Sequence, residues 1–249
     1  MSAVWSQGEY ARIAELFAPI HDDFVARMAP APGERWLDVG TGTGAIAVRA
    51  AHAGAAVTAI DIADSMLVQA RANADAAAVD VHWDLGDAQD LPYDDAAFDV
   101  VVSVFGVVFA PDRRAVASEL ARVCRRGGRL GLTAWQQRPE AQAVYRRFVP
   151  EPPEVEHTDW GREELVRDLL GEAFELELAT LEHVFAAASP EHAWEVLMAA
   201  PPNAAFLQRV DEARHSEVRD AFVEYFRRFE TPVGVREPRS YLFVHGTRR

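Results

Sequence analysis

Three alternating glycines near the start of the chain constrain its fold most. Residues 35–44 read Arg-Trp-Leu-Asp-Val-Gly-Thr-Gly-Thr-Gly, and an apolar, helix-favouring segment over 45–53 follows. This order predicts a strand, a tight turn and a helix. Glycines let a ligand approach the main chain, and the start of a helix presents unpaired N–H groups. The turn therefore favours a small, partly anionic ligand, although a tight connection without a ligand would have the same pattern.

Composition narrows the class of protein. At 249 residues, 49% of them hydrophobic, the chain is long enough to bury the core of one large domain. No apolar run approaches the roughly twenty residues that span a bilayer, and the N-terminus lacks a signal-peptide pattern, so we expect a cytoplasmic protein with no membrane partner. The net charge of −14 argues against nucleic acid as a partner. The single cysteine, Cys124, is interpreted as a buried thiol, and no histidine pair has metal-ligand spacing, so no metal is expected.

The fold is predicted from the alternation of apolar and amphipathic segments. After a helical segment over 11–28, short apolar strands alternate with helices. The expected strands cover residues 36–39, 56–61, 81–85, 98–105 and 129–134, and the expected helices cover 45–53, 65–77 and 113–124. Almost wholly apolar strands between amphipathic helices indicate a parallel sheet covered on both faces. The fold class is therefore α/β, with a doubly wound, mostly parallel sheet.

Beyond residue 135 the alternation loosens. Helices are expected over 141–148, 162–170, 193–199 and 206–229, a long strand over 174–186 and a last strand over 241–245. The two strands would close the sheet as a pair separated by a helical insertion, which makes seven strands in all. We expect one domain, 1–249, that acts as a monomer or homodimer. It comprises an N-terminal helical cover (1–33), a cofactor-binding core (34–135) and the remaining strands with helical cap insertions (136–249).

Two aspartates follow later strands of the expected sheet. Asp61 ends the second strand about twenty residues after the glycine turn, where a carboxylate can accept hydrogen bonds from both ribose hydroxyls of a nucleoside. It could instead cap the next helix. Asp87 follows the third strand and could accept from an exocyclic amine such as that of adenine, although an ordinary loop aspartate fits the position equally. Asp84 and Asp90 are its nearby competitors.

Five motifs occur in a fixed order at the ends of successive strands. They are Asp38-x-Gly40-x-Gly42-x-Gly44, Asp61, Gly86-Asp87, Phe98-Asp99-Val100-Val101 and Arg126-Gly127-Gly128-Arg129-Leu130. Over residues 36–135 this set resembles that of class I S-adenosylmethionine-dependent methyltransferases, in particular the branch of ubiquinone and menaquinone biosynthesis and bacterial small-molecule methyltransferases. The resemblance implies a Rossmann-like class I methyltransferase fold, S-adenosyl-L-methionine as cofactor and S-adenosyl-L-homocysteine as product.

The resemblance also implies a role for each motif residue. The methionine end of the cofactor would be held by the glycine loop, with Asp38, Gly40, Thr41, Gly42 and Gly44. Asp61 would hold the ribose, with Ile62 and Met66 packed on the ribose or adenine face. The adenine would lie against Gly86, Asp87 and Ala88. Ser103 and Val104 would lie under the sulfonium, and Phe105 would lead into the acceptor pocket.

The physical alternative is a nicotinamide dehydrogenase. A dinucleotide site needs the Gly-x-Gly-x-x-Gly spacing around a pyrophosphate, but here the third glycine comes one residue earlier. Asp38 would also repel a pyrophosphate, whereas its carboxylate suits the cationic ammonium of a methionine moiety. Spacing and charge therefore favour the methyltransferase interpretation.

Few side chains are needed to catalyse methyl transfer from a sulfonium. The leaving group is already activated, so the protein mainly aligns the acceptor and excludes water. If a general base acts, the candidates are His21, His157 and Tyr10, with His183 as a further histidine. A structural or surface role is the competing interpretation for each histidine.

Aromatic residues are the better candidates for an acceptor pocket, with core packing as the competing interpretation. They are Trp5, Tyr10, Phe105, Phe109, Trp135 and Trp160. We therefore expect methyl transfer to a small, largely apolar or aromatic acceptor. An S-adenosylmethionine-binding protein of the same fold without transfer remains open, because no convincing base is present. Nucleic-acid methylation is disfavoured, since Ser103-Val104-Phe105-Gly106 stands where an Asn-Pro-Pro-aromatic loop would be.

Overall fold

A computed structural model describes residues 16–151 and 155–249, so Trp5 and Tyr10 lie outside the described residues. A single sheet forms its centre, in the order β3-β2-β1-β4-β5-β8-β6, with the short β7 paired to β8. β1 to β5 are parallel, and β8 lies antiparallel between β5 and β6. The strands span Arg35–Val39 (β1), Ala56–Asp61 (β2), His82–Leu85 (β3), Phe98–Val104 (β4), Cys124–Trp135 (β5), Phe174–Ala187 (β6), Glu230–Thr231 (β7) and Gly234–Arg248 (β8). The predicted α/β class with a mostly parallel sheet is confirmed.

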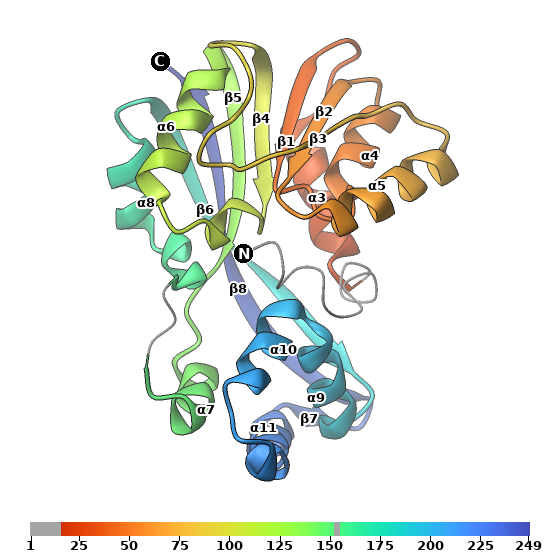
Figure 1. The fold of residues 1–249 in the computed structure, drawn as a ribbon, viewed down its shortest axis with the longest axis vertical. Coiled ribbons are helices and arrows are strands. Elements are labelled where there is room, and N and C mark those ends of the chain that lie inside the picture. Colours follow the sequence, from red (N-terminus) through yellow and green to blue (C-terminus); the bar gives the residue numbers. More distant parts are fainter. Residues whose placement is uncertain (1–15, 152–154) are drawn as a thin grey trace.

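Helices cover both faces of this sheet (Figure 1). One face carries α3 (Ala18–Met28), α4 (Ala45–His52) and α5 (Asp64–Ala77), and the other carries α6 (Arg113–Val123) and α8 (Glu163–Leu170). Alternate residues of β4 enter the two layers: Val100 and Val102 belong to the core with α3 and α4, and Val101 to the core with α6 and α8. All three valines are fully buried. A strand covered on both faces is apolar throughout, which is why the sequence pattern revealed it.

The remaining helices gather at one end of the molecule, below the sheet in Figure 1. They are α7 (Pro139–Phe148), α9 (Pro190–Ala199), α10 (Pro201–Gln208) and α11 (His215–Arg227), and we call them together the cap. β6 and β8 run from the sheet into the cap as one continuous antiparallel pair. The cap has its own apolar cluster, which includes the fully buried Phe222 and Phe226. The predicted strand pair split by a helical insertion is thereby confirmed.

Element boundaries differ most from the sequence prediction at three places. β5 begins at Cys124 rather than Arg129, because Gly127 (φ +68°) and its neighbours form a bulge inside the strand. The helix expected over 206–229 is two helices, since 211–217 has no large apolar side chain and Asp211 caps a turn there. β8 begins at Gly234, seven residues before the predicted start. None of the described helices is long and apolar enough to cross a membrane.

Candidate functional site

A hollow of about 950 Å³, its open mouth included, lies at the carboxyl ends of the parallel strands. Open parallel sheets bind their ligands at this edge. All the predicted cofactor residues except Gly44 and Ser103 line it, namely Asp38, Gly40, Thr41, Gly42, Asp61, Ile62, Met66, Gly86, Asp87, Ala88 and Val104. The fold therefore brings the separate sequence motifs to one cavity.

The glycine loop is tied to the end of β2. Gly40 (φ +67°) and Gly42 (φ +56°) have left-handed backbone angles that glycine adopts most readily. The N–H groups of Gly40 and Thr41 donate to the Ile60 carbonyl at 2.8 and 3.1 Å. Gly44 does not line the hollow, and a Cβ on it would lie 2.7 Å from the Trp83 ring. Gly44 therefore positions the loop by close packing instead of facing the cavity.

Asp38 is buried beneath this loop, with only 2% of its surface exposed. The Thr41 hydroxyl donates a hydrogen bond to its carboxylate at 2.6 Å. Burial raises the pKa of Asp38 to about 7, although hydrogen bonds from Thr41 and the Ala47 backbone act in the opposite direction. A cation placed beside Asp38 would favour its charged form, so the site suits a positively charged group.

Asp61 links the loop to the next helix. Its carboxylate accepts hydrogen bonds from the Gly42 N–H at 2.8 Å and from the Ala63 N–H at 2.9 Å. Ala63 is the residue that precedes α5, so Asp61 holds the residue before the helix while it also lines the hollow. Burial raises the pKa of Asp61. The alternative role as a helix cap is wrong, because Asp61 is buried and, among the described residues, no side chain caps the N-terminus of α5.

Of the acidic residues near the carboxyl end of β3, Asp87 is the one that lines the hollow. Its carboxylate accepts hydrogen bonds from the backbone and side-chain N–H groups of Gln89 at 2.9 to 3.1 Å. Asp84 instead accepts from the Tyr93 hydroxyl at 2.8 Å, and Asp90 is exposed. Neither of these two competitors lines the hollow. The geometry therefore favours Asp87 over both.

The turn after β4 packs directly against the glycine loop. The fully buried Ser103 hydroxyl donates to the Val39 carbonyl at 2.6 Å and accepts from the Val107 N–H at 3.0 Å. A Cβ on Gly106 would lie 2.6 Å from the Gly40 carbonyl oxygen. Ser103 thus holds the turn through these two hydrogen bonds and does not line the hollow. Phe105, in the same turn, lines it and has a left-handed φ of +55°, a conformation that costs a non-glycine residue roughly 1 kcal/mol.

Aromatic side chains extend from Phe105 away from the glycine loop. The Phe105 ring stacks on Trp135 with centroids 4.4 Å apart, and Phe17 contacts both rings. Phe109 also lines the hollow. The prediction that Trp160 lines the acceptor pocket is wrong. Its side chain is 2% exposed and lies in the core with α6 and α8. Cys124 is a buried thiol, and burial raises its pKa to about 11.

The histidines take distinct positions around these rings. His21 lines the hollow from α3, and burial together with the charge of Arg49 lowers its pKa to about 4. His157 stacks on Phe109 with centroids 5.2 Å apart, and His183 lies 5.8 Å from Phe17. Burial also lowers the pKa of His157 and His183. All three imidazoles are therefore neutral at pH 7.

Sequence reasoning missed several residues of the hollow. They include Thr43, Ala45, Ile46, Gly106 and Val107. Ala45 and Ile46 form the first turn of α4, so the position of the glycine loop was a signal that could have identified them. Within the described residues, no group of three histidine, cysteine or acidic side chains could hold a metal ion.

Comparison with known proteins shows which protein family the region that builds this hollow is similar to. Residues 37–128 match the methyltransferase domain family, and this segment contains the glycine loop, Asp61, Asp87 and the turn after β4. Over these residues the chain is similar to methyltransferase domains, and its fold is that of class I methyltransferase structures. The resemblance inferred from the motifs is thus confirmed.

Two curated relatives of this methyltransferase domain are informative. An uncharacterised protein of Mycobacterium tuberculosis is 38% identical over 176 residues, which cover 68% of this chain and 64% of that protein. The ubiquinone/menaquinone biosynthesis C-methyltransferase of Cereibacter sphaeroides is 39% identical over 127 residues, 49% of this chain and 51% of that enzyme. The chain therefore spans less than two thirds of the length of these relatives.

Solved structures share the methyltransferase fold at low identity. A Bacillus halodurans protein described as a methyltransferase has a TM-score of 0.64 at 21% identity, covering 91% of this chain and 97% of its own. A [4+2]-cyclase has a TM-score of 0.61 at 22% identity, covering 93% and 81%. A Haemonchus contortus phosphoethanolamine N-methyltransferase in complex with S-adenosylhomocysteine has a TM-score of 0.59 at 17% identity, covering 92% and 52%. These likenesses show the fold.

Proposed function

We propose that this protein transfers a methyl group from S-adenosylmethionine to a small, largely apolar or aromatic acceptor. The observation that carries the proposal is the single hollow in which Asp38 and Asp61 meet the ring of Phe105. The relatives named as methyltransferases support it, as does the N-methyltransferase of the same fold with bound S-adenosylhomocysteine. The strongly negative net charge favours a small molecule over nucleic acid.

The chemistry of the hollow fits the parts of the cofactor. The buried Asp38, with its raised pKa, suits the ammonium of the methionine moiety. Asp61 would accept hydrogen bonds from the ribose hydroxyls and Asp87 from the adenine amine, since both carboxylates line the hollow. Ile62 and Met66 offer apolar surface to the ring system. The methionine, ribose and adenine parts of the cofactor would thus each meet a residue of suitable chemistry, whereas Gly44 and Ser103 do not line the hollow.

When bound, S-adenosylmethionine would supply a methyl group on a cationic sulfur: the acceptor atom would bond to that methyl carbon in line while the carbon–sulfur bond breaks and the neutral thioether, S-adenosylhomocysteine, leaves. The chain's own task is to orient the acceptor and exclude water. Stacking on Trp135 holds the Phe105 ring as a wall of the hollow, and Phe109 supplies further aromatic lining. The neutral imidazole of His157, stacked on Phe109, is the candidate to receive a proton from a hydroxyl or amine acceptor.

Calorimetry with S-adenosylmethionine and S-adenosylhomocysteine tests the cofactor site. We expect both to bind, and we expect Asp87→Ala to weaken binding about tenfold if it accepts a hydrogen bond from the adenine. Asp90→Ala is the matched control, because Asp90 is exposed three residues away and does not line the hollow. A folded protein that binds neither compound would contradict the proposal.

The second candidate is a protein of the same fold that binds S-adenosylmethionine without transferring its methyl. Two observations favour it: the hollow's own histidine, His21, has a pKa too low for an effective base, and a [4+2]-cyclase shares the fold. Incubation of a bacterial small-molecule extract with methyl-labelled S-adenosylmethionine separates the two. Enzyme-dependent label in a product eliminates the binding-only alternative.

A further inference from the structure

A buried cluster of charges lies beside the cap and has no part in the proposed cofactor site. Glu237 on β8 is 1% exposed, and its carboxylate accepts hydrogen bonds from Arg138, Arg239 and Tyr225. Arg138 Nη1 donates at 2.6 Å, and Arg239 Nε and Nη2 donate at 2.8 and 2.6 Å. Two guanidinium groups therefore share one carboxylate, and the cluster has one positive charge in excess.

Nothing in the described part of the chain neutralises this excess. Over residues 16–151 and 155–249, Glu237 is the one carboxylate in contact with either Arg138 or Arg239. The Arg239 side chain is 8% exposed, and its guanidinium lies 3.8 Å from the centre of the Phe185 ring. Burial and the like charge of Arg138 lower the pKa of Arg239 to about 10. A buried charge without a full partner is costly, so an anion at this place would be stabilised.

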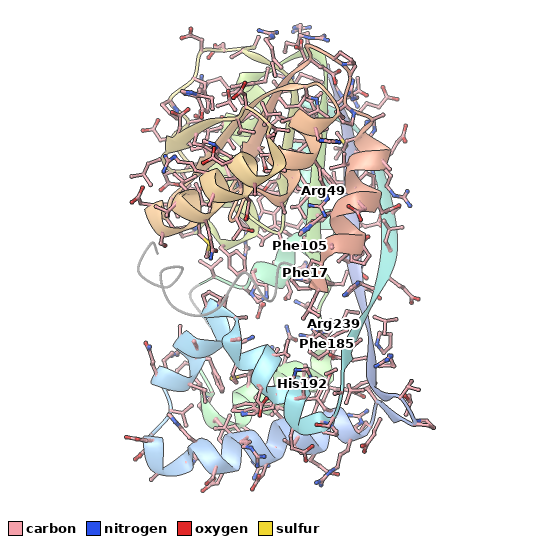
Figure 2. All side chains as sticks on the ribbon, turned by 90° about the vertical axis from the view of Figure 1, so that its right-hand side faces the viewer. Phe17, Arg49, Phe105, Phe185, His192 and Arg239 are labelled. Atoms are coloured by element: carbon pink, nitrogen blue, oxygen red, sulfur yellow. The ribbon has the colours of Figure 1, made fainter. Side chains whose placement is uncertain are left out.

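The cluster continues the aromatic wall of the hollow. Alternate residues of a strand share a face, so Arg239 lies on the same face of β8 as Tyr241. Tyr241 lies 5.9 Å from the rings of both Phe105 and Trp135. Arg239 is paired across the strands with His183. Figure 2 shows Phe105, Phe17, Arg239 and Phe185 one below another from the sheet towards the cap.

Arg138 approaches the same region from the start of α7. Its positive charge contributes, after burial, to the lowered pKa of His157, which stacks on Phe109 of the hollow. The charge of Arg239 contributes in the same way to the lowered pKa of His183. The excess charge therefore acts on His157 beside Phe109 and on His183 beside Phe17 and Trp135, on the acceptor side of the site.

Both guanidinium groups keep donors available. Among the described residues, no hydrogen-bond acceptor is recorded for Arg239 Nη1 or for Arg138 Nε and Nη2. The side-chain atoms that are fully buried there without a partner are Arg113 Nε, Thr133 Oγ1 and Trp160 Nε1. The free nitrogens of Arg138 and Arg239 are not among them, so these atoms keep some exposed surface.

We propose that Arg138 and Arg239 bind the carboxylate of an aromatic acceptor whose ring lies against Phe105. A planar guanidinium pairs with a carboxylate through two parallel hydrogen bonds, and the bound anion would neutralise the cluster. The inference rests on the proposed function, since it names the class of molecule that receives the methyl. The distance between the ring and the carboxylate would then set the specificity.

The test measures binding of para-hydroxylated benzoate, phenylacetate and phenylpropionate, each against its primary amide, to protein saturated with S-adenosylhomocysteine. For at least one spacer length we expect the acid to bind about tenfold more tightly than its amide. Arg239→Gln and Arg138→Gln should each remove most of this preference of the acid over its amide. Arg236→Gln is the matched control, because Arg236 lies on the other face of β8, where its guanidinium donates to the Val235 carbonyl.

Binding of S-adenosylhomocysteine is measured in every variant. It shows that the variant is folded and that the cofactor site is intact, independently of acceptor binding. If S-adenosylhomocysteine binds and the wild-type protein does not distinguish acids from amides, or binds none of these probes, the acceptor inference is overturned while the methyltransferase proposal stands. A preference that survives both substitutions overturns it as well. Should Arg239→Gln fail to fold, the wild-type comparison and Arg138→Gln still decide.

Discussion

At the scale of single residues, Asp38 should couple cofactor binding to protonation. Its pKa of about 7 means that the carboxylate is half protonated near neutral pH. An ammonium needs the charged form, so the affinity for S-adenosylhomocysteine should fall as the pH drops below 7, approaching about tenfold per pH unit. Asp38→Asn should bind weakly at every pH. Calorimetry between about pH 5 and 8 checks this; a flat wild-type profile would count against the assigned contact.

The same residue should affect stability with the opposite pH dependence. Because the folded-state pKa of Asp38 is raised above its ordinary value of 3.8, its contribution to stability is present below that value and is lost as the pH rises through about 7. Asp38→Asn cannot ionise. Without ligand, the free energy of unfolding of this variant relative to wild type should therefore be more favourable at pH 8 than at pH 5. Urea denaturation at both pH values measures it, and equal differences would refute the prediction.

At the scale of elements, the contact between the turn after β4 and the glycine loop should be essential to the site. Ser103→Ala leaves the Val39 carbonyl and the Val107 N–H without their buried partner. We expect a loss of about 1–3 kcal/mol in the free energy of unfolding and weaker S-adenosylhomocysteine binding. Ser118→Ala, an exposed position on α6, should change stability by less than about 0.5 kcal/mol. Equal effects of the two substitutions in urea denaturation would contradict the assigned role.

The cap should be separable from the cofactor site. Phe222 is fully buried in the apolar cluster of the cap, where its ring contacts Tyr145, Trp194 and Phe206. Phe222→Ala should lower the free energy of unfolding by about 3–5 kcal/mol. Since the cluster shares no residue with the hollow, the affinity for S-adenosylhomocysteine should stay within about twofold. Denaturation and calorimetry test both parts, with the exposed Val233→Ala as control.

Over the whole molecule, the sequence predicts the fold where one physical signal dominates. β1 and β4 are recognisable because both faces are buried, and the glycine loop because its backbone angles need glycine. The early part of β8 is not, because the buried Glu237 pairs with Arg239 and with Arg138, which lies 99 residues before Glu237 in the chain. A hydropathy pattern does not contain such a partner. Motif order likewise located the turn at Ser103, but only packing shows that its hydroxyl points away from the cavity.

At this scale the net charge opposes the local charge of the proposed acceptor site. The formal charge of −14 repels an anionic molecule at a distance, whereas Arg138 and Arg239 attract it at close range. The screening length falls from about 30 Å at 0.01 M salt to about 8 Å at 0.15 M. The association rate of an acidic probe should therefore rise severalfold over this range, while that of its amide stays constant. Stopped-flow tryptophan fluorescence measures both, and an acid rate that falls with added salt would show that the two guanidinium groups govern the long-range field instead.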